Sequence, residues 1–97
     1  MIEHIVLLRW TEKATQEAID RAMAELRSLN EKIPGIVDLS SGANFSERSK
    51  GFTHGLVVRF KDRAALEAYL PHPEHQRVVQ TFINPIRGDA IIVDFEV

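Results

Sequence analysis

The sequence has no cysteine among its 97 residues, and this absence excludes several kinds of chemistry. Without thiols there is no disulfide framework, no thiolate nucleophile and no cysteine-ligated metal. A long apolar run is also missing, because the hydrophobic centre of the first ten residues spans only four residues between charged or polar ones. That length is too short for a signal sequence or a membrane span. We therefore expect a cytoplasmic protein with no membrane partner.

Neither sign of charge is in clear excess. Twelve Lys and Arg residues against 14 Asp and Glu residues give a formal net charge of −2, and no basic run is present. Because neutralising nucleic-acid phosphates takes clustered Lys and Arg, we expect no nucleic-acid partner. A chain of 97 residues, 44% of them hydrophobic, is long enough for one core, so residues 1–97 are expected to form a single domain.

The chain does contain a regular succession of strand and helix patterns. Alternating apolar residues predict strands over 3–10, 36–45, 52–60 and 90–97, and helical spacing predicts helices over 15–32, 63–70 and 73–84. Thr15 and Asp62 stand where a side chain caps a helix start. Low apolar content makes the second strand an edge or a bulged strand. The order predicts an α+β, ferredoxin-like β-α-β-β-α-β fold, a four-stranded antiparallel sheet with helices on one face.

The first, third and last predicted strands carry apolar residues on both of their alternating faces. Helices in this plan cover only one face of the sheet, so the other face needs a cover that the chain does not supply. A second copy of the chain is the simplest source of that cover. The pattern therefore predicts a homodimer with sheet facing sheet.

A proline-bracketed turn between the last two helices carries Tyr69, His72 and His75. Strand alternation places His4 and His54 on the same faces as valine and leucine side chains. If these faces look toward the helices, both imidazoles point into the space beneath the turn and form an apolar cavity with a few polar groups. There a neutral His75 could take a proton alpha to a carbonyl, while Tyr69 hydrogen-bonds the enolate oxygen.

Structural roles are the alternative for each of these residues. His72 and His75 could satisfy backbone groups and cap the following helix, and Tyr69 could be a core tyrosine. His4 and His54 could be strand histidines bonded to each other or to water. No two histidines have the i, i+4 spacing of helix-borne ligands, so we predict no metal site and no cofactor.

Five segments, in this order, resemble the stress-responsive A/B barrel (Dabb) domain family: His4–Trp10, Ile33–Gly35, Ser49–Val58, Tyr69–His75 and Val93–Phe95. The likeness spans essentially the whole chain, which makes residues 1–97 a single Dabb-like domain. The resemblance implies the dimeric α+β barrel fold of that family. This agrees with the dimeric arrangement predicted from the residues alone.

Within that family the chain is similar to polyketide cyclases of the olivetolic acid cyclase type, which close a linear polyketide by aldol condensation. The likeness implies catalytic roles for Tyr69 and His75. It also implies ligand contacts for His4, Val6, Leu8, Met23, Leu26, His54, Leu56, Val58 and Ile92. His72, from the turn itself, is a further candidate ligand contact. Ala22, Met23 and Leu26 stand where those cyclases have large aromatic residues, so their alkyl-chain pocket does not transfer.

Three functions follow as hypotheses. The first is an enzyme with cyclase-like proton transfer on a carbonyl or polyketide-like substrate. The second is a non-catalytic, stress-related binding or assembly module, whose ligand would be a small apolar or phenolic compound. The third is a cofactor-free monooxygenase of the kind found on related dimeric barrels, an idea that rests on fold alone.

Overall fold

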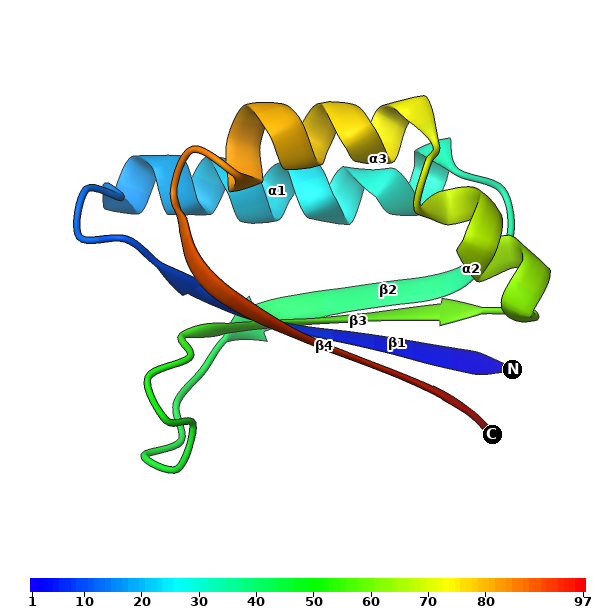
Figure 1. Ribbon diagram of the computed structural model, residues 1–97, viewed down its shortest axis with the longest axis horizontal. Coiled ribbons are helices and arrows are strands. Elements are labelled where there is room, and N and C mark those ends of the chain that lie inside the picture. The colour runs from blue at the N-terminus through cyan, green and yellow to red at the C-terminus, as the bar shows by residue number, and fades with distance from the viewer.

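The computed structural model describes all residues 1–97, with helices on one side of a four-stranded sheet (Figure 1). The elements in chain order are β1 (Ile2–Trp10), α1 (Gln16–Lys32), β2 (Ile36–Ala43), β3 (His54–Phe60), α2 (Arg63–Tyr69), α3 (Pro73–Val78), the π-helical turn η1 (Val79–Ile83) and β4 (Arg87–Glu96). The α+β ferredoxin-like plan predicted from the sequence is confirmed.

The sheet is antiparallel throughout, with strand order β2-β3-β1-β4. β1 lies in the interior of the sheet and places His4 between Val58 of β3 and Asp94 of β4. β2 is an edge strand, and its register with β3 shifts between Ile36 and Asp38. It is therefore both an edge and a bulged strand, as its low apolar content predicted.

Local signals set most of the element boundaries. The Thr15 side chain accepts a hydrogen bond from the Ala18 amide (3.1 Å), and Asp62 caps α2 in the same way, so both predicted caps are confirmed. β3 begins at His54, two residues later than predicted, because the Phe52 amide donates to the Ser49 carbonyl in the preceding turn. β4 begins at Arg87, three residues earlier than predicted, because its pairing with β1 continues to the end of that strand.

The core lies between the helices and the sheet. Its largest fully buried side chains are Tyr69, Phe60, Leu29, Val58 and Val78. The opposite face of the sheet has no helix over it (Figure 1). Large apolar side chains there remain 36–50% exposed, namely Leu7, Ile91, Val93 and Phe95. None of the helices has both the length and the apolar character that crossing a membrane requires.

Gly35 provides a test of how closely α2 packs onto the turn before β2. Its φ is +93°, and a Cβ atom there would lie 2.8 Å from the Ala65 Cβ. We expect Gly35→Ala to lower the free energy of unfolding by about 1–3 kcal/mol, because both the backbone conformation and the contact become strained. Urea unfolding measures this loss. Gly42→Ala is the matched control, since its Cβ would meet nothing within 4 Å, and equal stability losses in both variants would contradict the packing argument.

Candidate functional site

A cavity of about 310 Å³ opens between the sheet and the turn that joins α2 to α3. Fourteen residues line it, ten of them hydrophobic. Eight of the predicted site residues are among them: His4, Val6, Leu8, Leu26, Leu56, Tyr69, His75 and Ile92. An apolar space with a few convergent polar groups is the general form of a small-molecule site.

Tyr69 occupies the last position of α2 and is only 1% exposed. Its ring packs against those of Phe60 (5.0 Å between centroids), His75 (4.4 Å) and His4 (5.9 Å). Burial raises the pKa of the Tyr69 hydroxyl well above its ordinary value, because a phenolate would be poorly solvated there. The hydroxyl therefore stays protonated at neutral pH and can act as a hydrogen-bond donor toward the cavity.

His75 lies in the short helix α3, directly after the proline turn. Its Nδ1 is 2.9 Å from the Leu70 carbonyl oxygen, so Nδ1 carries the proton and donates it, while Nε2 is left as an acceptor. Burial lowers the pKa of His75, the bond to Leu70 opposes part of that effect, and the nearby His4 and His72 lower the pKa further. At neutral pH the ring is therefore neutral, with an unprotonated nitrogen available as a base.

His4 is 4% exposed, and its Nδ1 hydrogen-bonds the Asp94 carboxylate on the neighbouring strand. Because an ionised carboxylate only accepts hydrogen bonds, the His4 Nδ1 is the donor in this pair. Burying an imidazole is costly without such a partner. The cavity thus contains two histidines, each oriented through Nδ1 by a fixed acceptor.

His54 does not line this cavity, and the expectation that both strand histidines share one space is wrong. Both face the helices, but in the antiparallel register His54 lies opposite Leu8, four residues along β1 from His4 and so about 13 Å away. Its Nδ1 accepts a hydrogen bond from the Trp10 indole N–H (3.0 Å). Burial lowers the pKa of His54, and the Asp20 carboxylate opposes that shift in part.

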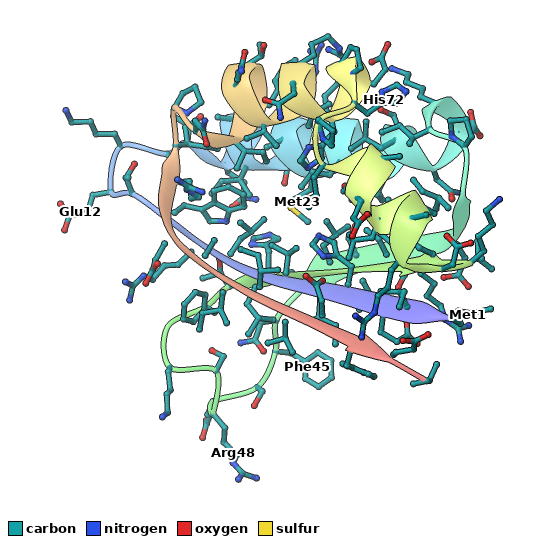
Figure 2. All side chains as sticks on the ribbon, turned by 45° about the vertical axis from the view of Figure 1, so that its right-hand side comes forward. Met1, Glu12, Met23, Phe45, Arg48 and His72 are labelled. Carbon is teal, nitrogen blue, oxygen red and sulfur yellow. The ribbon has the colours of Figure 1, made fainter.

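Three further predicted contacts also lie outside the cavity lining. Val58 and Met23 are buried in the core, and Figure 2 shows Met23 between the helical layer and the sheet. Met23 borders a separate hollow of about 220 Å³ beside His54. His72 is the N-cap of α3, where its Nδ1 accepts from the Glu74 amide (3.1 Å), as its structural alternative anticipated.

Six residues of the lining were not predicted from the sequence, namely Leu70, Val79, Ile83, Arg87, Ala90 and Asp94. Two of them, Arg87 and Asp94, are charged. The signal for Asp94 was available, because strand alternation places it on the same face as Ile92. No such signal was available for Arg87, because regular alternation places Arg87 on the opposite face of the strand from Ala90. A bulge in β4 between Arg87 and Ala90 brings Arg87 to the same face as Ala90.

Comparison with known proteins gives a consistent family. The sequence model of the stress-responsive A/B barrel domain matches residues 2–97. A stress-response A/B barrel domain-containing protein of Arabidopsis thaliana is 30% identical over 97 residues, which are 99% of this chain and 37% of that protein. The chain therefore spans little more than a third of the length of that relative.

Solved structures show the same fold. A dimeric ferredoxin-like protein from a Jannaschia species is 33% identical, with a TM-score of 0.82 and coverage of 99% of this chain and 98% of that one. A hydroxynitrile lyase from Passiflora edulis has a TM-score of 0.90 at 21% identity, with coverage of 99% and 92%. At that identity the second likeness establishes the fold alone.

The lowered pKa values of His54 and His75 predict a pH dependence of stability. In the unfolded chain both titrate near about 6.5, so as the pH falls the unfolded state takes up these protons before the folded state does. The free energy of unfolding should therefore decrease as the pH drops below about 6.5. Urea unfolding at several pH values measures this, and His75→Gln should remove part of the decrease. A free energy that stays flat or rises over this interval contradicts the assignment of neutral imidazoles.

Proposed function

The chain belongs to the stress-responsive A/B barrel domain family, and from this premise we propose that its cavity binds a small carbonyl compound, phenolic or polyketide-like, and catalyses proton transfer beside the carbonyl. One observation supports the proposal above all. Tyr69 and His75 pack ring to ring at 4.4 Å on one cavity, and burial favours a protonated phenol beside a neutral imidazole. These are the protonation states that a hydrogen-bond donor and a general base require.

In the proposed step the carbonyl oxygen of the substrate lies at the Tyr69 hydroxyl. The unprotonated Nε2 of His75 takes the proton from the adjacent carbon, and the C–H electron pair becomes that of an enolate. Tyr69 stabilises the charge that develops on oxygen by a hydrogen bond. The enolate carbon then either attacks a second carbonyl of the same substrate, as in a cyclase, or takes the proton back. Acid–base catalysis of this kind contributes about 10²–10⁴ in rate.

His4 and Asp94 support this arrangement. The Asp94 carboxylate accepts the Nδ1 proton of His4 and fixes the orientation of the ring, so Nε2 is the nitrogen left for a substrate. A substrate hydroxyl, such as a phenol or an enol, could hydrogen-bond that nitrogen and be oriented by it. The hydroxynitrile lyase from Passiflora edulis is an enzyme with the same fold, so a catalytic cavity is reasonable on this fold. The likeness does not imply that this chain acts on the substrate of that enzyme.

The proposed assembly is a homodimer through the uncovered face of the sheet. That face carries the exposed apolar side chains of Leu7, Ile91, Val93 and Phe95, a patch that monomers rarely leave open. The Jannaschia structure, which shares the fold, is described as dimeric. At the end of the same face the Arg59 guanidinium pairs with Glu3 (3.1 Å), so a polar cluster borders the apolar patch.

The catalytic proposal predicts hydrogen–deuterium exchange at the benzylic position of phenylacetone in deuterated buffer, followed by proton NMR. The protein should accelerate the exchange, and both Tyr69→Phe and His75→Gln should lower the rate by about 10² or more, because each removes one partner of the proton transfer. His54→Gln is the control, because it removes another histidine with a lowered pKa that lies outside the cavity.

Equal exchange rates in the native protein and the Tyr69 and His75 variants would overturn the catalytic proposal. Binding of phenylacetone without any accelerated exchange would instead favour the binding-module hypothesis. Calorimetric or spectroscopic evidence that each variant is folded must accompany the rates, because Tyr69 is a core residue.

The dimer proposal predicts a molar mass of twice the 11.0 kDa chain by light scattering at micromolar concentration. Val93→Glu should shift the protein to the monomer mass, because it places a charge in the middle of the apolar patch. Ala24→Glu, at an exposed position of α1, is the matched control and should leave the dimer intact. A monomeric native protein, or a Val93→Glu variant that remains dimeric, would contradict the sheet-to-sheet arrangement.

A further inference from the structure

Arg87 adds a positive charge to the cavity that the proton-transfer step does not use. It lines the cavity and is exposed to solvent, and none of the salt bridges of the chain involves it. The other charged side chain of the lining, Asp94, is already paired with His4. The cavity therefore has one unpaired guanidinium and no unpaired carboxylate.

A β-bulge directs Arg87 to this side of the sheet. Asp89 pairs with Arg9, but the next pair is Arg87 with Trp10, so Gly88 is the extra residue. Without the bulge Gly88 would lie opposite Trp10, and Arg87 would point to the uncovered face. A Cβ atom at position 88 would lie 2.9 Å from the Trp10 carbonyl oxygen, which explains why glycine occupies this position.

The polar groups of the cavity are separated along β4. Arg87 lies at the start of the strand beside Trp10, whereas Asp94 lies near its end, with His4 opposite. The lining residues of β4 between them, Ala90 and Ile92, are apolar. Ala90 and Asp94 alone are about 13 Å apart along the strand. A ligand that reaches both ends is therefore elongated, with an apolar middle.

We propose that the cavity takes a keto acid, with its carboxylate held by Arg87 and its carbonyl at Tyr69 and His75. The carbonyl end rests on the function proposed above, whereas the carboxylate end rests on Arg87 alone. Arginine is suited to a carboxylate because its planar guanidinium donates two parallel hydrogen bonds.

A singly charged acid fits better than a phosphate ester. Arg87 is the only arginine or lysine in the lining, and no second cation there could share a double negative charge. The chain as a whole carries a formal charge of −2, so no general positive field attracts polyanions. The ligand class is thus an aromatic or aliphatic monocarboxylic acid that also carries a ketone.

The test compares 11-oxododecanoate with 11-oxododecanamide, which differ in one charge and whose extended chains can span the about 13 Å between the two ends of the cavity. By calorimetric titration at low ionic strength the acid should bind the native protein about fivefold more tightly or better, as a partly exposed ion pair allows. Arg87→Gln should abolish this preference, and added salt should weaken it. Trp10, the single tryptophan, lies opposite Arg87, so its fluorescence should respond to the bound acid.

Arg48→Gln is the matched control, since Arg48 is also exposed but lies on the loop that projects away from the cavity (Figure 2). It should keep the preference for the acid. Equal binding of the acid and the amide, a preference that survives Arg87→Gln, or no binding of either compound at millimolar concentration would each overturn the proposal. Preference for the acid without proton exchange would leave the Arg87 site standing and count against the catalytic function, so the two failures are distinguishable.

Discussion

The helices cover a single face of the sheet, and this one-sided cover decides which side chains of β1 are buried beneath the helices and which lie on the uncovered face. Alternate residues, among them Ile2, His4 and Leu8, enter the space beneath the helices and are nearly fully buried. Their neighbours Ile5 and Leu7 remain on the uncovered face. The cavity and the proposed dimer surface are therefore two consequences of one strand, and a shift of its register by one residue would exchange them.

The four histidines share a chemical principle but not a location. Each has its Nδ1 fixed by a nearby group: a carboxylate for His4, an indole N–H for His54, a backbone amide for His72 and a backbone carbonyl for His75. The partner decides which nitrogen remains free. Only the two histidines whose Nδ1 donates lie on the cavity, so in both Nε2 is the nitrogen left for a ligand.

Local chemistry was readable from the sequence, and relations between strands were readable only in part. The caps at Thr15 and Asp62 depend on residues three positions away, so their signals were sufficient. Alternation correctly grouped His54 on one face of its strand with Leu56 and Val58, but the distance between His54 and His4 depends on antiparallel register, which one strand does not encode. Arg87 was hidden for a related reason, because a bulge alters alternation at one residue.

The wall of the cavity includes a π-helical turn, η1, which contributes Val79 and Ile83. Its closing bond runs from the Asn84 amide to the Val79 carbonyl, five residues back, so the turn holds one residue more than an α-helical turn. Deleting one residue there would restore the α-helical bonding pattern and rotate the wall, while the sheet that carries His4 and Asp94 would be unaffected. Single-residue insertions and deletions at this turn thus offer an evolutionary route to new cavity shapes around the same polar residues. Related chains could diverge in ligand by changing helix length rather than the polar side chains of the cavity.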